Sequence, residues 1–113
     1  MELKHYETIF ILSPLLSSKQ IKVSVDKYRD FLIAHHASII YEEAIGLKPL
    51  AYPIAHKKSG VYHLIEFASP PELVKELEVT YARDEEVLRF LTFALDKHAV
   101  EHNAKRRSTE SAG

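Results

Sequence analysis

The chain has no cysteine and only three glycines among its 113 residues. Without cysteine the protein can form no disulfide, no thiolate metal site and no thiol nucleophile, which also fits a reducing cytoplasm. The few glycines form no G-x-G-x-x-G or Walker-type loop of the kind that cradles phosphates in nucleotide-using enzymes. These absences exclude enzymes that depend on a thiol nucleophile, on a metal held by thiolates, or on a glycine-rich phosphate loop.

Long hydrophobic runs and an excess of one charge are also missing. The longest apolar stretch near the N-terminus, Ile9 to Leu12, is too short for a membrane span or a signal peptide, so we expect no membrane partner. Fifteen lysines and arginines stand against 16 aspartates and glutamates, for a net charge of -1. Any binding to nucleic acid must therefore come from local basic patches.

The remaining composition, 46 % hydrophobic and 27 % charged residues, is that of one folded domain. Alternation over His5 to Leu12 predicts a strand with Tyr6, Thr8, Phe10 and Leu12 on one face. Ser17 and Gln20 have capping-box spacing, which predicts that a helix begins there. Its apolar stripe is expected to be Ile21, Val25, Tyr28 and Leu32.

The middle of the chain predicts two strands and a hairpin. Ser38 to Tyr41 starts a strand that resumes at Leu50 to Ile54, and the prolines at 49 and 53 favour a bent edge strand. Lys57 to Gly60 is short, polar and contains glycine, which predicts the hairpin turn. The next strand is expected over Val61 to Phe67.

A second helix and a last strand complete the pattern. Ser69 is the expected N-cap, with Pro70 in the first helical position and Glu72 reaching back. The buried stripe of this helix is expected to be Leu73, Leu77 and Tyr81, and Val87 to Leu95 forms the last strand.

The order β-α-β-β-α-β predicts an α+β, ferredoxin-like fold: a four-stranded antiparallel sheet with two helices on one face. The other face is not polar, because Ile9, Ile11 and alternate residues of the last strand must lie there. An apolar open face indicates an interaction surface, either for another macromolecule or for a second copy of the chain.

The last residues differ from the rest. From Glu101 the apolar pattern stops, and Lys105, Arg106 and Arg107 outnumber the acids Glu101 and Glu110. We expect residues 1–100 to form the domain and residues 101–113 to be a disordered basic tail, which either contacts RNA phosphates or stays solvated.

No constellation of residues predicts catalysis, a metal or a cofactor. His98 and His102 have a zinc-compatible spacing but lack a third ligand, and Asp84 to Glu86 is typical of a solvated turn. The loop Ser13 to Leu16 lacks the glycine and arginine of acylphosphatases, which share this topology. In the third strand Leu64 stands where an RNA-recognition motif has an aromatic residue, which argues against base stacking there.

Basic residues instead occur at the edges and ends of the expected elements. Such cations would contact the phosphates and sugars of folded RNA and recognise its shape. The candidates are Lys4, His5, Lys48, Lys57, Lys58, Arg83, Arg89 and Lys97.

Three segments carry a resemblance to a known family. They are Lys4-His5-Tyr6-Glu7, then Gly46 to Ile54 followed by Gly60-Val61-Tyr62, then Val87 to Leu91 with Lys97-His98 after it. In this order and spacing the chain resembles the bacterial ribosomal protein S6 family of the small subunit.

The resemblance implies a cytoplasmic, non-catalytic protein of the small ribosomal subunit, without a cofactor or small-molecule substrate. It implies that the chain pairs with ribosomal protein S18 and binds the central domain of the small-subunit ribosomal RNA, in the platform. RNA contacts are then expected at Lys4, His5, Lys48 and Arg89, and also near Lys97 and His98. The partner contact is expected at Leu50, Ala51, Tyr52, Ile54 and Tyr62.

The resemblance leaves one alternative of another class open. A domain of the same topology could instead be a homodimeric ligand-binding or regulatory module. That function would need a pocket with convergent polar groups, and the sequence indicates none.

Overall fold

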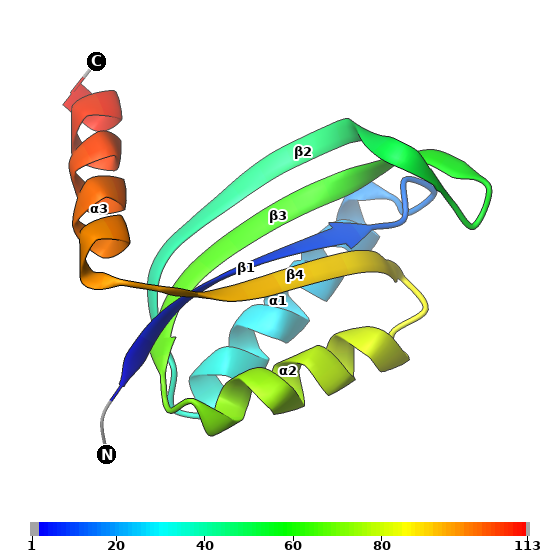
Figure 1. Ribbon diagram of the computed structural model, residues 1–113. Coiled ribbons are helices and arrows are strands. Elements are labelled where there is room, and N and C mark those ends of the chain that lie inside the picture. The colour runs from blue at the N-terminus through cyan, green and yellow to red at the C-terminus, as the bar shows by residue number, and fades with distance from the viewer. Residues whose placement is uncertain (1–2, 113) are drawn as a thin grey trace.

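Four strands and two helices follow one another in the predicted order, and a third helix comes after them (Figure 1). The computed structural model describes residues 3–112, and the side chains of residues 3–107. The strands form one antiparallel sheet in the order β2-β3-β1-β4, which confirms the ferredoxin-like prediction. The elements are β1 (Lys4–Leu12), α1 (Ser18–Ala34), β2 (Ser38–Ile54), β3 (Lys57–Ser69), α2 (Glu72–Arg83), β4 (Val87–Leu95) and α3 (Lys97–Ala112).

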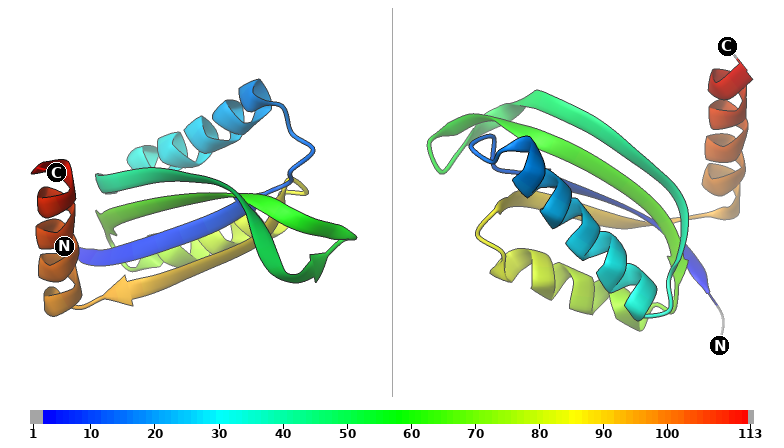
Figure 2. Two further views of the ribbon diagram at one scale, coloured as in Figure 1. Left: turned by 90° about the horizontal axis from the view of Figure 1, so that it is seen from above. Right: turned by 180° about the vertical axis from the view of Figure 1, so that it is seen from behind.

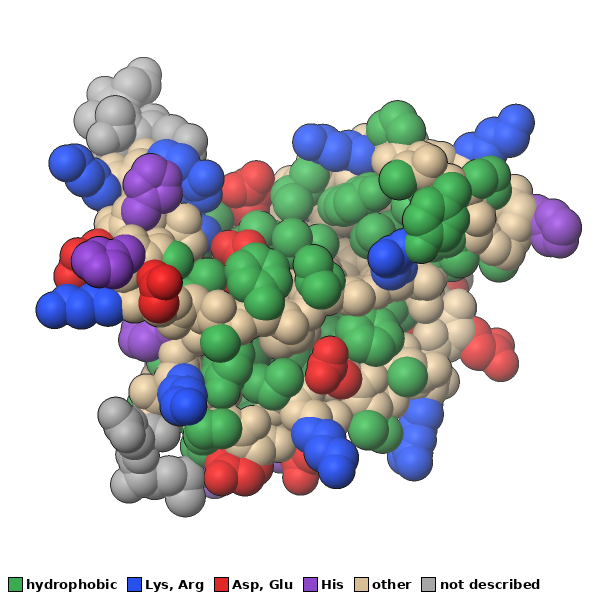
Figure 3. Space-filling model, in the orientation of Figure 1, with side chains coloured by type: hydrophobic (Ala, Val, Ile, Leu, Met, Phe, Trp, Pro, Cys, Tyr) green, Lys and Arg blue, Asp and Glu red, His purple; other side chains and the backbone are tan. Residues whose placement is uncertain are grey.

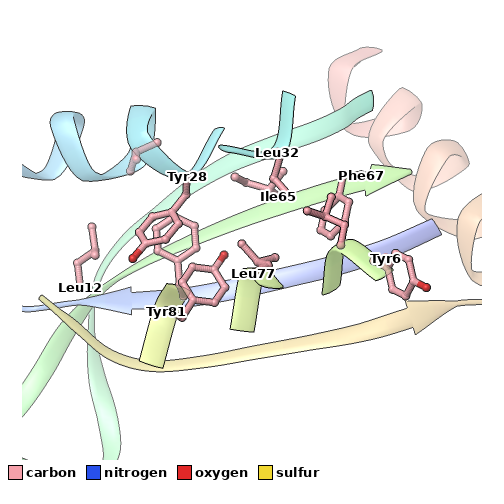
Figure 4. Close-up of a cluster of buried hydrophobic side chains, with 11 residues drawn as sticks. Tyr6, Leu12, Tyr28, Leu32, Ile65, Phe67, Leu77 and Tyr81 are labelled. Atoms are coloured by element: carbon pink, nitrogen blue, oxygen red, sulfur yellow. The ribbon is translucent and has the colours of Figure 1, made fainter. Parts of the chain in front are cut away.

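The core lies between the sheet and the helices α1 and α2, which cover the same face (Figure 2). Tyr28 of α1 and Tyr81 of α2 point toward each other (Figure 4), with 4.6 Å between their ring centroids. Both rings also pack on Phe10 of β1. The Tyr81 hydroxyl shares a 3.1 Å hydrogen bond with Thr8, so its polar end is satisfied. The predicted inward face of β1 and the stripes of both helices are therefore confirmed.

The two helix starts differ in how well the sequence predicted them. Ser17 caps α1, with both hydrogen bonds of the capping box to Gln20 present. The predicted cap at Ser69 is wrong, because Ser69 pairs with Lys4 in the sheet and ends β3. α2 begins only at Glu72, after Pro71, without a side-chain cap.

The hairpin turn lies two residues earlier than predicted. Ala55 and His56 form it, both with positive φ (50° and 64°), and Lys57 to Gly60 belong to β3. The sequence hid this turn because neither residue is the Asn or Gly that favours such a conformation. Gly60 serves another purpose: a Cβ there would lie 2.3 Å from a methyl group of Ile11, so only glycine lets β3 pass so close to β1.

β2 is the predicted edge strand and it is irregular. Its pairing with β3 shifts register between Ala44 and Gly46 and again after Pro49. Gly46 has a φ of 98°, which an L-residue rarely adopts, and it allows the bulge at this point. β2 and β3 extend beyond the other strands as a long hairpin, which bends away from the plane of the sheet (Figure 2).

Residues 101–112 of the expected basic tail lie in helix α3 (Lys97–Ala112) in the structure. α3 continues to Ala112, and the expected domain boundary at residue 100 falls inside this helix. Gly113 lies outside the described residues. The helix is weakly amphipathic, and it contacts the sheet through the polar side chains of Arg107, described below, and of Asn103, which donates a 3.5 Å hydrogen bond to Glu66.

Candidate RNA- and protein-binding surfaces

The face of the sheet opposite α1 and α2, here the open face, has an apolar centre. Ile9 of β1 lies between Leu64 of β3 and Leu91 of β4 in the strand register. Leu91 is 58 % exposed and Phe93, two residues on, is 39 % exposed. Hydrophobic side chains spread over the strands and around the end of the β2–β3 hairpin, with lysines and arginines near the margins (Figure 3). This surface matches the open apolar face that the sequence predicted.

At the hairpin end of the open face a shallow pocket of about 250 Å³ forms. Tyr52 is 54 % exposed, and the Arg89 guanidinium lies 5.2 Å from the centre of its ring. The Tyr62 hydroxyl donates a 3.2 Å hydrogen bond to the carbonyl of Pro49, which ties the two strands of the hairpin together. Ile11 and Arg89 line this hairpin pocket. The pocket is also lined by all five residues predicted to contact a protein partner, which are Leu50, Ala51, Tyr52, Ile54 and Tyr62.

At the opposite end of the sheet three of the predicted RNA-binding residues come together. Lys4 and His5 begin β1, and Lys97 begins α3 directly after β4. All three line a second pocket of about 530 Å³, here the α3 pocket. The sequence could not show this proximity, because more than 90 residues separate Lys4 from Lys97.

The other basic candidates are scattered. Lys48, Lys57 and Lys58 lie on the hairpin, at the end of the sheet away from Lys4. Arg83 ends α2 on the helix side, in a depression that it shares with Asp84, Glu85 and Glu86. Those acids make this depression a poor place for phosphate. The structure therefore places the RNA candidates in two groups, with Arg83 apart from both.

α3 docks on the open face through a contact that the sequence did not predict. Arg107 donates a hydrogen bond to Glu66, which is only 1 % exposed, and also lies 3.9 Å from Glu7. Its guanidinium stacks at 3.6 Å from the ring centre of Tyr41. Glu7 and Glu66 face each other across β1 and β3, so the arginine separates two carboxylates that would otherwise repel.

Burial raises the pKa of Glu7, and Arg107 offsets only part of that rise. The signal in the sequence was an isolated acid, Glu66, within the apolar strand segment Leu64 to Phe67. Such a residue needs a buried partner. Arg107, in a segment assigned to a tail, was the partner.

A second unpredicted network closes the edge of the helix-covered face. Arg29 of α1 donates two hydrogen bonds, of 2.7 and 2.6 Å, to the carboxylate of Glu42 of β2. The His63 imidazole forms a 2.6 Å hydrogen bond with the same carboxylate. The Arg29 hydrogen bonds, followed by His63, hold the pKa of Glu42 below its usual range despite burial. These groups line a groove of about 620 Å³, but they satisfy one another and leave no group poised for chemistry.

The acidic turn after α2 is likewise structural. Asp84 accepts hydrogen bonds from the Tyr28 hydroxyl and from Lys27. Among the residues that the structure describes, no three His, Asp or Glu side chains converge as a metal site. None of the described helices has the length and apolar character to cross a membrane.

Comparisons with known proteins agree with this architecture. The family described as ribosomal protein S6 matches residues 5–94. The small ribosomal subunit proteins bS6 of Phocaeicola vulgatus and Bacteroides fragilis are 51 % and 52 % identical over 109 residues, which covers 96 % of this chain and 96 % of each relative. The crystal structure of 30S ribosomal protein S6 from Thermotoga maritima superimposes with a TM-score of 0.80 at 24 % identity, over 96 % of this chain and 99 % of that one. The chain belongs to the ribosomal protein S6 family.

Proposed function

We propose that this chain binds the central domain of small-subunit ribosomal RNA jointly with ribosomal protein S18, and that the hairpin end of the open face is where the two proteins meet. Family membership already makes the chain a structural protein of the small subunit of the cytoplasmic ribosome rather than an enzyme. The observation that carries the finer proposal is the hairpin pocket, which gathers apolar side chains from β1, β2 and β3 beside an exposed cation, Arg89.

The pocket suits a protein better than it suits RNA alone. Tyr52 is large, half exposed and held by a cation–π contact with Arg89, the kind of aromatic residue that anchors protein interfaces. Burying this apolar surface against a partner would remove it from water. It would also bring Arg89 and Lys48 to the margin of the joint surface.

Charge explains why a partner is needed. With a net charge of -1, the isolated chain has no long-range attraction for a polyanion. A basic partner docked at the hairpin would place its own cations beside Lys48, Lys57 and Lys58. The heterodimer would then present enough positive charge to release counterions from the RNA backbone.

A titration of the central-domain RNA fragment tests this mechanism. The fragment is titrated with the chain alone, with S18 alone and with both proteins, at several salt concentrations. We expect tight binding only with both, and a salt slope smaller by about one for Lys48→Ala or Arg89→Ala. Lys75→Ala, an exposed cation on α2 at the far side of the sheet, is the matched control. Equal affinity with and without S18 would contradict joint binding.

The protein contact is tested separately. Tyr52→Ala should weaken S18 binding by about tenfold or more, because a half-exposed aromatic anchor is lost without disturbing the core. Val23→Ala removes a similarly exposed side chain on α1, where it is 62 % exposed, and should have no effect. Calorimetry measures both. Sedimentation of the isolated chain would reveal a homodimer formed through the open face, which would favour the regulatory alternative.

A further inference from the structure

The α3 pocket combines features that neither the partner contact nor simple phosphate binding uses. It lies where β1 begins, β4 ends and α3 starts, and its volume is about 530 Å³, within the range of small-ligand sites. Four of its eight lining residues are apolar: Leu3, Ala94, Leu95 and Val100.

The other four lining residues are two lysines, one histidine and one glutamate. Lys4 and Lys97 are both exposed at the pocket, against one acid, Glu101. The carboxylate of Asp96 accepts the backbone N–H of Ala99 and so caps α3.

The imidazole of His5 adds an unmet hydrogen-bonding group. Its Nδ1 atom is buried and finds no hydrogen-bond partner among the described residues. A buried polar atom without a partner costs free energy, and a ligand that offers a hydrogen bond would recover it.

We propose that the α3 pocket binds one unpaired nucleotide. The base lies on the apolar lining, its edge hydrogen-bonds to Nδ1 of His5, and Lys4 and Lys97 contact the flanking phosphates. The source of that nucleotide, ribosomal RNA, rests on the proposed function. The chemistry of the pocket rests on its own residues.

The lining favours a nucleotide over a simpler anion. An inorganic phosphate would use the two lysines but would leave the apolar lining and His5 without contacts. An unpaired nucleotide presents a flat apolar face, a hydrogen-bonding edge and a phosphate together, and unpaired bases are what proteins read in RNA. A docked base would thereby add selectivity for an unpaired position to a surface that otherwise recognises only shape.

An NMR titration of the full chain tests the pocket without ribosomal RNA or S18. Adenosine and guanosine monophosphates are added, with ribose 5-phosphate as the probe that lacks a base, and the backbone amides are followed. We expect saturable shifts confined to residues around the α3 pocket, such as His5, Leu95, Lys97 and Val100. The affinity for the nucleotides should exceed that for ribose 5-phosphate by on the order of fivefold or more.

Two variants connect the response to the pocket. Ala94→Trp fills the space from an exposed position and should abolish the nucleotide response, whereas Ala82→Trp, at an exposed position on α2, should leave it unchanged. His5→Leu should reduce the preference for nucleotides over ribose 5-phosphate. Amide spectra of each variant confirm that it folds.

Two outcomes would overturn the inference. Equal affinity for nucleotides and ribose 5-phosphate would leave only an anion site, and no saturable shift at the pocket would leave no site at all. Neither outcome affects the titration of the RNA fragment with S18, so the proposed function would stand or fall by that separate measurement.

Discussion

The face of the sheet under α1 and α2 is packed with side chains of the two helices, whereas the described residues cover the open face only at the end where α3 docks. On the covered face, Phe10, Tyr28 and Tyr81 are essentially inaccessible to water, and an ionic network closes its edge at Glu42. On the open face, Leu91 and Tyr52 remain more than half exposed. The covered face supplies stability, whereas the open face leaves apolar surface accessible to water.

The two faces also use charge differently. On the covered side, Arg29 bonds to the carboxylates of both Glu42 and Asp26, and the His63 imidazole bonds to Glu42 as well. On the open side, Arg107 faces two carboxylates that lie opposite each other. Each arginine thus holds two carboxylates, but Glu7 and Glu66 are more deeply buried than Glu42 and Asp26, and they receive Arg107 and Asn103 from α3.

The largest expected difference between the faces is in packing. Leu77→Ala on the covered face should lower the free energy of unfolding by about 2–5 kcal/mol, because Leu77 is fully buried and its loss leaves a cavity. Leu91→Ala, the same change on the open face, should cost less than about 0.5 kcal/mol. Urea unfolding measures both. Similar losses for the two variants would show that the open face is buried in the free protein.

Arg107→Gln tests the anchor of α3. Removing the guanidinium leaves Glu7 and Glu66 facing each other without a cation, so we expect α3 to lose about 1–3 kcal/mol of docking free energy. Amide hydrogen exchange over residues 97–107 should accelerate while the exchange of β1 and β3 stays slow. Arg106→Gln makes the same charge change at an exposed position of the same helix, where the arginine acts on Glu7 without a hydrogen bond, and should accelerate exchange much less. Unchanged hydrogen exchange in Arg107→Gln would show that Arg107 does not hold α3 on the sheet.

The pH dependence of stability should have opposite signs on the two faces. The pKa of Glu42 is lowered in the folded protein, so its contribution is present above its ordinary value of 4.5 and is lost as the pH falls through the folded pKa. The pKa of Glu7 is raised, so its contribution is present below 4.5 and is lost as the pH rises through the folded pKa.

The free energy of unfolding is measured between about pH 3 and 7 for the parent protein, Glu42→Gln and Glu7→Gln, and this separates the two contributions. Relative to the parent, Glu42→Gln should lose less stability on acidification. Glu7→Gln should lose less stability, or gain it, as the pH rises. Parallel profiles for all three would contradict the difference between the faces.

The smallest expected effect concerns the turn that carries the hairpin pocket. Ala55→Asn combined with His56→Gly suits the left-handed backbone at both positions and should stabilise the protein by about 0.5–1 kcal/mol. Ala55→Val places a β-branched residue at the same φ and should destabilise it. Thermal unfolding distinguishes the two. If the double variant were as stable as the parent protein, the backbone of the turn would be relaxing independently of the sheet.

Local rules predicted the elements that depend on neighbours along the chain. The alternation of β1, the capping box at Ser17 and the stripe of Leu73, Leu77 and Tyr81 all express interactions within a few residues, so they could be read directly. The cap at Ser69 was predicted wrongly because its pairing with Lys4 lies 65 positions away and outweighs the local capping preference. The turn at Ala55–His56 was missed for the related reason that the paired strands impose a backbone its residues disfavour.

The binding surfaces divide in the same way. The residues predicted to contact a protein partner from Leu50 to Ile54 come from one segment, so the motif that indicated them also placed them together. The α3 pocket joins both ends of the chain, and the anchor of α3 joins Arg107 to acids on β1 and β3. No sequence pattern indicates these contacts, because they join residues that are far apart in the chain.

By itself, the sequence determined the ferredoxin-like order of elements, the apolar open face and the family, because hydrophobic period and motif spacing are properties of the linear chain. Only the tertiary structure decided that α3 lies against the open face, that Glu66 bonds to Arg107, and that Lys4, His5 and Lys97 share a pocket. The physical reason is that a buried charge is compensated in three dimensions. The residue that compensates it is chosen by the fold and can lie anywhere in the chain.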